Sequence, residues 1–289
     1  MDINYYSPKR KLDHTTLLSL EGVMPDDIFE IILEAERLST MFKMKENMRF
    51  LSGKSAILYT DKPHSFFRVG FECATHLLDC HSIVVPLERS ETEDMDDLVR
   101  DIRLSKNKQV VAEFFDVSFI DEIFPNVSDS SRPIFDARVD GNAIFSLTTL
   151  LSLKKEFKKL SGLKVAVIEG KKLHSLTVAL AKSQVALTVF GQELSDEAAS
   201  AEYLNQFVPV KFAHSATSAI KEADAIVFLS DDAVTLSNVL TGKDKKTKVV
   251  LSPYSPLFNL LEKANEQEFS CDAAMNCTET IAGILSLLA

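Results

Sequence analysis

The sequence lacks tryptophan, has four cysteines among its 289 residues, and contains no apolar run long enough to span a membrane. None of the cysteines forms a CxxC pair, so neither a disulfide framework nor a zinc ribbon is expected. The N-terminal residues have no apolar signal region. These absences predict a chain that stays in the reducing cytoplasm and makes no use of a membrane.

The sequence also lacks a long basic stripe, and its formal net charge is −10. The two densest basic stretches, 154–159 and 243–248, are short and interrupted. Nucleic acid is therefore not an expected partner, because phosphate contacts need clustered cations. Cys73, His76 and Cys80 have a spacing that places metal ligands on one helix face, but no fourth ligand is evident. We expect buried small residues there, and neither a metal nor a cofactor.

What the sequence does contain is a regular alternation of apolar, β-branched runs with helical stretches. Continuous apolar runs such as VAVI are typical of parallel strands that are buried on both faces. The expected strands are 56–60, 82–87, 109–115, 133–137, 164–168, 186–190, 208–212, 225–229 and 248–251. The expected helices are 25–41, 67–78, 93–104, 142–160, 173–182, 195–206 and 279–288, with Ser195 as the cap of the sixth. This order predicts an α/β fold of two doubly wound parallel-sheet domains.

Three stretches resemble the aspartate and ornithine carbamoyltransferases, with the aspartate branch the nearer. The first is 51–63 (LSGKSAILYTDKP) with Arg68 and Glu72, the second is 164–168 (KVAVI) with 173–182 (LHSLTVALAK), and the third is 249–253 (VVLSP) with the final helix. The resemblance implies two α/β domains joined by two helices. It places a carbamoyl-phosphate-type domain at 1–145, with the helix 275–289 returning to it, and an amino-acid-binding-type domain at 146–274. It also implies a homotrimer.

The side chains that hold carbamoyl phosphate in this family are mostly replaced. The family's Ser-Thr-Arg-Thr-Arg loop aligns with five residues here: His64, Ser65, Phe66, Phe67 and Arg68. A phenyl ring supplies neither charge nor a hydrogen-bond donor, so Phe66 and Phe67 are expected to fill the former phosphate pocket. Glu113 aligns with an arginine at the end of the family's third strand. The stretch that aligns with the family's His-Pro-x-Gln motif, 139–142, has neither its His nor its Gln, and Asn142 is the one residue there with a side-chain amide.

The amino-acid half is altered as well. Lys171 stands for the arginine that grips a substrate carboxylate, and Ser230, followed by Asp231 and Asp232, stands for a second arginine. The family's His-Pro-Leu-Pro segment keeps one proline, in Ser252 and Pro253. No catalytic residue is assigned from the sequence.

These replacements leave three interpretations open. In the first, the protein is a catalytically degenerate relative that binds a small anionic or amino-acid ligand, or a partner such as a catalytic carbamoyltransferase subunit. In the second, it is a carbamoyltransferase with altered specificity, in which Glu113, Asp231 and Asp232 select a cationic amine. In the third, His64, Ser65, Arg68 and Lys171 act as substitute donors in an active enzyme. Binding of carbamoyl phosphate distinguishes the interpretations, because only the first is compatible with its absence.

Overall fold

A computed structural model describes residues 12, 16–17, 19–44, 48–62, 66–87, 109–121, 133–138, 143–170, 174–191, 197–251, 257 and 267–288. The chain divides into two compact units, the first formed by Met1–Leu147 with Met275–Ala289 and the second by Thr148–Ala274. The domain boundaries expected from the sequence differ from this division by two residues. Two helices, α5 (Ala143–Phe157) and α11 (Gln267–Leu287), run across the boundary between the units.

The first unit is built on a five-stranded parallel sheet with the order β1-β5-β4-β2-β3. Its strands are β1 (Thr16–Leu17), β2 (Ser55–Thr60), β3 (His81–Pro86), β4 (Val110–Asp116) and β5 (Ile134–Asp136). Nearly every residue of β2 and β4 is buried, as expected for strands covered on both faces. One face carries an aromatic row, in which Phe114 contacts the rings of Phe67, Phe71 and Phe135.

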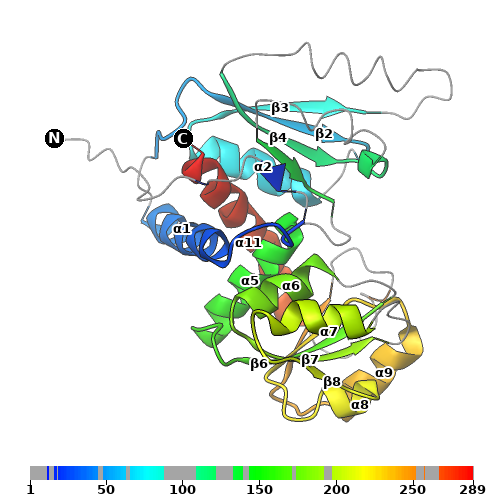
Figure 1. Cartoon of the computed structure of the whole chain (residues 1–289). Helices are drawn as coiled ribbons and strands as arrows, with labels where there is room; N and C mark the ends of the chain where they lie inside the picture. The colour runs from blue at the N-terminus through cyan, green and yellow to red at the C-terminus, as the bar shows by residue number, and fades with distance from the viewer. Residues whose placement is uncertain are drawn as a thin grey trace. The chain divides into compact units, whose positions relative to one another are not determined.

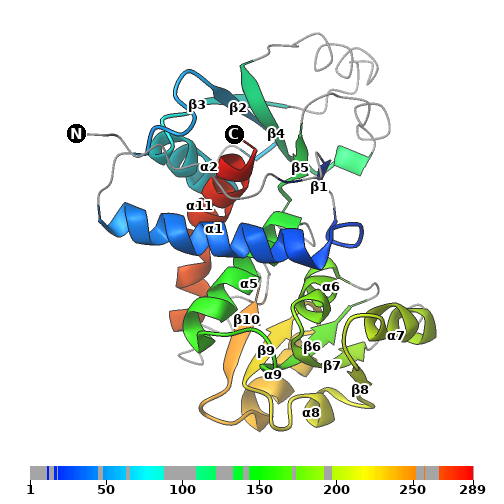
Figure 2. The same ribbon diagram turned by 60° about the vertical axis from the view of Figure 1, so that its left-hand side comes forward.

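The last helix of the first unit packs against two earlier helices of the same unit (Figures 1 and 2). The three helices are α1 (Pro25–Lys43), α2 (Phe66–Leu77) and α11. Gly283 of α11 lies against the backbone of α1, where an added Cβ would come within 3.1 Å of the Ala35 nitrogen. Ser286 of α11 also donates a hydrogen bond of 2.8 Å to the buried carboxylate of Glu34. The last helix of the chain is therefore part of the core of the first unit.

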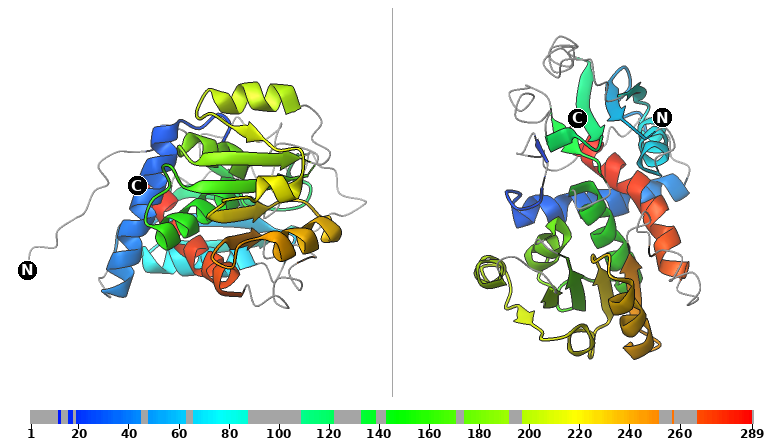
Figure 3. Two further views of the ribbon diagram at one scale, coloured as in Figure 1. Left: turned by 90° about the horizontal axis from the view of Figure 1, so that it is seen from below. Right: turned by 90° about the vertical axis from the view of Figure 1, so that its right-hand side faces the viewer.

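The second unit has its own five-stranded parallel sheet, with the order β10-β9-β6-β7-β8 (Figure 3). The strands are β6 (Lys164–Glu169), β7 (Ala186–Gly191), β8 (Lys211–Phe212), β9 (Ala225–Phe228) and β10 (Lys248–Leu251). Among the described residues, the helices of this unit, besides the residues of α5 and α11 that it contains, are α6 (Ser175–Lys182), α7 (Glu197–Asn205), α8 (Ala216–Ala219) and α9 (Ala233–Gly242). Together they produce two doubly wound α/β units, which confirms the predicted fold class.

The differences from the sequence-based elements have local causes. The strand expected at 208–212 is reduced to Lys211–Phe212, because Pro209 has no N–H to donate to a sheet. The helix expected from residue 173 begins at Ser175, because His174 is its N-cap. The short elements β1 and α8 and the ten-residue helix α9 were not anticipated. The helix expected at 93–104 and the cap at Ser195 lie outside the described residues. Within the described residues, no helix has the length and hydropathy needed to cross a membrane.

Candidate functional site

Each sheet has one position where the chain leaves in opposite directions, and ligands of open α/β sheets bind beyond the carboxyl ends of the strands at such a position. In the first sheet this position lies between β2 and β4, because β3 follows β2 on one side and β4 lies on the other. In the second sheet it lies between β6 and β9. The residues just beyond these strand ends are therefore the candidates for a site in each unit.

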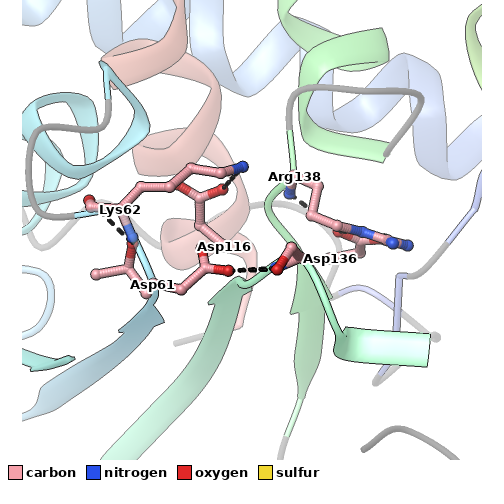
Figure 4. Close-up of polar contacts among 7 residues, drawn as sticks. Asp61, Lys62, Asp116, Asp136 and Arg138 are labelled. Atoms are coloured by element: carbon pink, nitrogen blue, oxygen red, sulfur yellow. Dashed lines mark hydrogen bonds and ion pairs between the residues drawn. The ribbon is translucent and has the colours of Figure 1, made fainter. Parts of the chain in front are cut away.

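Three aspartates stand at the ends of three neighbouring strands of the first sheet (Figure 4). Asp61 follows β2, Asp116 ends β4 and Asp136 ends β5. Asp61 Oδ2 accepts hydrogen bonds from the backbone N–H and the hydroxyl of Ser118, at 2.8 and 2.6 Å. Its Oδ1 is buried and has no hydrogen-bond partner among the described residues. This edge of the sheet is therefore acidic, because each of these carboxylates belongs to a residue at or next to the end of a strand.

Both cations that Figure 4 labels at this edge are already bound to carboxylates. Lys62 Nζ lies 3.5 Å from Oδ1 of Asp116, whose side chain is fully buried. Arg138 donates to Asp136 through Nη2 at 2.7 Å and to Asp121 through Nη1 at 2.9 Å. Burial raises the pKa of Asp136, while the Arg138 guanidinium opposes that rise. The described part of this edge thus contains four aspartates and two cations, and it has no cation in excess.

The structure describes part of the segment that aligns with the phosphate loop. Phe67 is 2% exposed, and its ring centroid lies 5.9 Å from that of Phe114. Arg68 points along the helix instead, where its Nε lies 3.0 Å from Oε1 of Glu72. His64 and Ser65 lie outside the described residues, as does the side chain of Phe66. At the start of α2, an aromatic ring is therefore part of the hydrophobic core, and the retained arginine is paired within its own helix.

Glu113 does not stand where the sequence placed it. It is fully buried within β4, three residues before the last residue of the strand, and pairs in register with Ile57 and Ile134. The residue at the carboxyl end of this strand is Asp116. The motif comparison matched Glu113 to an arginine at a strand end, although the expected strand, 109–115, already continued past this residue. Asn142 lies outside the described residues.

In the second unit, the corresponding edge carries a buried carboxyl group. Glu169 ends β6, and its Oε1 accepts hydrogen bonds from the backbone N–H of His174 and the hydroxyl of Thr177. Its Oε2 is buried without a hydrogen-bond partner among the described residues. Burial raises the pKa of Glu169 to about 7, and burial lowers the pKa of His174 to about 4. Glu169 therefore holds the first turn of α6 from within the protein.

The acids expected to face a ligand in the second unit have structural contacts. Asp232 is the N-cap of α9, where Oδ1 accepts from the N–H of Val234 and Oδ2 from the hydroxyl of Thr235. The hydroxyl of Ser230 accepts a hydrogen bond from the N–H of Asp232. Asp231 is exposed. Lys171, Ser252 and Pro253 lie outside the described residues.

The structure gives no support to the alternative metal site. The expected burial of these residues is wrong for Cys73 and His76, which are exposed on α2, whereas Cys80 lies beyond the end of the helix and is buried. Burial raises the pKa of the Cys80 thiol to about 11, which disfavours the thiolate that a metal would need. Among the described residues, no cluster of His, Cys, Asp and Glu side chains has the geometry to hold a metal ion.

Sequence reasoning missed the polar residues that the strand ends position, because the motif comparison directed attention to the loops. A usable signal was present in the sequence. Each of these residues ends an apolar strand or follows it within two positions: Asp61, Lys62, Asp116, Asp136, Arg138 and Glu169.

Comparisons with known proteins agree with this architecture. The chain is 24% identical over 195 residues to the aspartate carbamoyltransferase catalytic subunit of Thermoplasma volcanium, a match covering 63% of this chain and 62% of that one. It superposes on Pyrococcus furiosus ornithine carbamoyltransferase with a TM-score of 0.73 and 17% identity, over 96% of this chain and 97% of the other. It superposes on Trypanosoma cruzi aspartate transcarbamoylase, solved with carbamoyl aspartate and phosphate, with a TM-score of 0.75 and 16% identity, over 96% and 97%. No family model matches the sequence.

The chain therefore has the fold of the aspartate and ornithine carbamoyltransferases, which confirms the resemblance found in its sequence. The sequence relative named above is an aspartate carbamoyltransferase, and the structural neighbours include both branches.

Proposed function

We propose that this protein is a catalytically degenerate relative of the aspartate and ornithine carbamoyltransferases that acts by binding a ligand or a partner. The observation that carries the proposal is the pairing of cations at the carboxyl edge of the first sheet. Lys62 and Arg138 are both bound to aspartates, and the edge has an excess of carboxylates. A dianionic phosphate needs uncommitted cations and helix N–H groups, and it is repelled by carboxylates.

The start of α2 supports the same conclusion. Phe67 occupies core space beside Phe114, and Arg68 is paired with Glu72. Losing one cation from a phosphoryl or carbonyl site costs a few kcal/mol of transition-state stabilisation, and each 1.36 kcal/mol corresponds to about a tenfold change in rate. Several such losses would remove most of the rate advantage of an ordinary enzyme.

The interpretation as an enzyme with altered specificity receives less support. It needs acids that are available to a cationic amine, but Asp232 caps α9 and Glu113 is buried inside β4. Of the three acids on which it relied, only Asp231 is exposed.

The decisive experiment measures formation of carbamoyl aspartate and citrulline at millimolar substrate, together with calorimetric titration of carbamoyl phosphate. The wild-type protein is expected to show neither turnover nor binding. The double variant Asp121→Asn, Asp136→Asn, which leaves Arg138 without these two carboxylates, is expected to gain measurable binding of the anion. Robust wild-type turnover that disappears in Arg68→Ala would show that the site is active with other donors, and the proposal would be wrong.

We also propose that the protein forms a homo-oligomer, with a trimer as the expected assembly, and that a catalytic carbamoyltransferase subunit is a candidate partner. The support is the fold shared with those enzymes over almost the whole chain. Light scattering at micromolar concentration tests the first statement, and a strict monomer would contradict it. Co-purification with the catalytic subunit of the same organism tests the second.

A further inference from the structure

A hollow lies at the amino end of the second sheet, opposite the strand ends described above. Its cavity volume is about 200 Å³. Its floor is one face of β6, β7 and β8, where Ala166 is in register with Thr188, and Thr188 with Lys211. Residues in register on parallel strands point to the same side, so these side chains and that of Ala186 share one face. The hollow exists because this face carries small side chains and because α8, which packs on β6 and β7, has only four residues (Figure 2).

Three lysines surround the hollow. Lys164 begins β6, Lys211 begins β8 and Lys221 follows α8, and all three line the cavity. Neither Lys211 nor Lys221 forms an ion pair with any described residue. Glu222 is the one acid among the lining residues, and it lies 3.5 Å from Lys164, with both side chains more than half exposed. Such an exposed pair is weak, so the hollow keeps a net positive charge.

A second hollow adjoins the first and differs from it in the balance of charges. It shares Lys221, Glu222 and Ala223 with the first hollow, and it also contains further charged residues: Asp224, Lys243, Asp244 and Lys246. Its lysines and acids are equal in number, and it therefore has no preference for an anion. Asp224 is bound through its carboxylate to the backbone N–H of Lys164, at 3.0 Å. Of these two adjoining hollows, only the one over β6, β7 and β8 has an excess of cations, in a chain whose net charge is −10.

We propose that this hollow binds a small anion with two or more negative charges. Three ammonium groups held around one concavity repel each other, and a multivalent anion relieves that repulsion. Lysine binds phosphate as a point charge without requiring a fixed fork geometry. The volume corresponds to about six or seven water molecules of liquid, so the ligand is a small phosphate-bearing or polycarboxylate compound and not a nucleotide. The site does not depend on the proposed function, because it involves the opposite end of the strands and none of the residues at the carboxyl edges.

The test uses the full-length protein, with pyrophosphate and citrate as separate probes in calorimetric titrations at low salt. Saturable binding by the wild type is expected for at least one of them, and the comparison of the two distinguishes a phosphate from a carboxylate preference. The variant Lys211→Gln, Lys221→Gln is expected to bind at least tenfold more weakly. The variant Lys159→Gln, Lys245→Gln loses the same charge from exposed positions of the same unit outside the hollow, and its affinity is expected to change less than twofold.

A second variant tests the position of the ligand independently of the lysines. Ala186→Asp places a carboxylate on the exposed floor of the hollow and is expected to abolish binding. The proposal would be overturned by the absence of saturable binding of either probe. It would also be overturned if the two double variants weakened binding equally, because the protein would then attract anions only through its general charge.

Discussion

Arg138 is bound by Asp136, two residues before it in the chain, through an Nη2–Oδ2 contact of 2.7 Å. The same guanidinium also reaches Asp121, whose side chain is 80% exposed. The two contacts differ in burial, since the side chain of Asp136 is 5% exposed. One arginine therefore makes a partly buried pair and a surface pair at the same time.

This difference predicts unequal effects of two substitutions. Arg138→Met leaves the carboxylate of Asp136 buried without its cation and is expected to lower the free energy of unfolding by roughly 2 kcal/mol, less than for fully buried pairs because Arg138 is a quarter exposed. Asp121→Asn removes only the surface contact and is expected to cost under about 0.5 kcal/mol. Urea denaturation of both variants measures the difference. Equal losses of unfolding free energy would show that the partly buried pair with Asp136 stabilises the protein no more than the surface pair with Asp121.

The position of Phe67 predicts a loss of stability on truncation. Phe67→Ala removes a ring that is 2% exposed and contacts Phe114, so the free energy of unfolding is expected to fall by roughly 3–4 kcal/mol. Val69→Ala, on the same helix but 63% exposed, is the control and is expected to change it by less than about 0.5 kcal/mol. Chemical denaturation measures both. A Phe67→Ala variant as stable as the wild type would show that the ring does not fill the core.

Glu169 predicts a stability that depends on pH. Burial raises its pKa to about 7 in the folded protein, so its contribution is fully present below the ordinary value of 4.5 and is lost as the pH rises to 7. His174 acts in the opposite direction, because its lowered pKa of about 4 makes its contribution decrease as the pH falls below 6.5. In the wild type, the pH dependences that Glu169 and His174 give to the free energy of unfolding largely cancel. Glu169→Gln removes only the first.

The variant Glu169→Gln is therefore expected to match the wild type near pH 4 and to exceed its free energy of unfolding by roughly 3 kcal/mol at pH 8. Urea unfolding of both proteins at intervals between these pH values measures the difference. A difference that stays constant with pH would mean that Glu169 does not titrate in this range.

The approach of α11 to α1 predicts that even a small side chain at Gly283 is harmful. A Cβ there would lie 3.1 Å from the backbone nitrogen of Ala35 and 3.2 Å from the carbonyl oxygen of Ile31, and backbone atoms cannot move aside easily. Gly283→Val is expected to cost about 1–3 kcal/mol or more and to lower the thermal midpoint. Gly22→Ala, where nothing lies within 4 Å, is the control and should leave the midpoint unchanged.

The sequence was sufficient for the fold because the apolar strands and the spacing of the three matched stretches survive in this chain. It was less informative for the site, because alignment by motif does not locate the end of a strand. The motif comparison matched Glu113 to a strand-end arginine, but this residue lies inside β4, which continues through two phenylalanines to Asp116. The ion pairs Lys62–Asp116 and Arg138–Asp121 join residues that are 54 and 17 positions apart in the chain. Such pairs depend on strand order and register, which a single sequence does not specify.

The return of α11 to the first unit also determines when each unit becomes complete during synthesis. Domains generally fold as units, the N-terminal one first, as the chain leaves the ribosome. Here the first unit lacks the helix containing Gly283 and Ser286 until residues 275–289 have been made, whereas the second unit is contiguous from Thr148 to Ala274. The first unit is thus completed after the second. A nascent chain with residue 274 just outside the ribosomal exit tunnel would present a second unit with all its residues and a first unit whose core is still open.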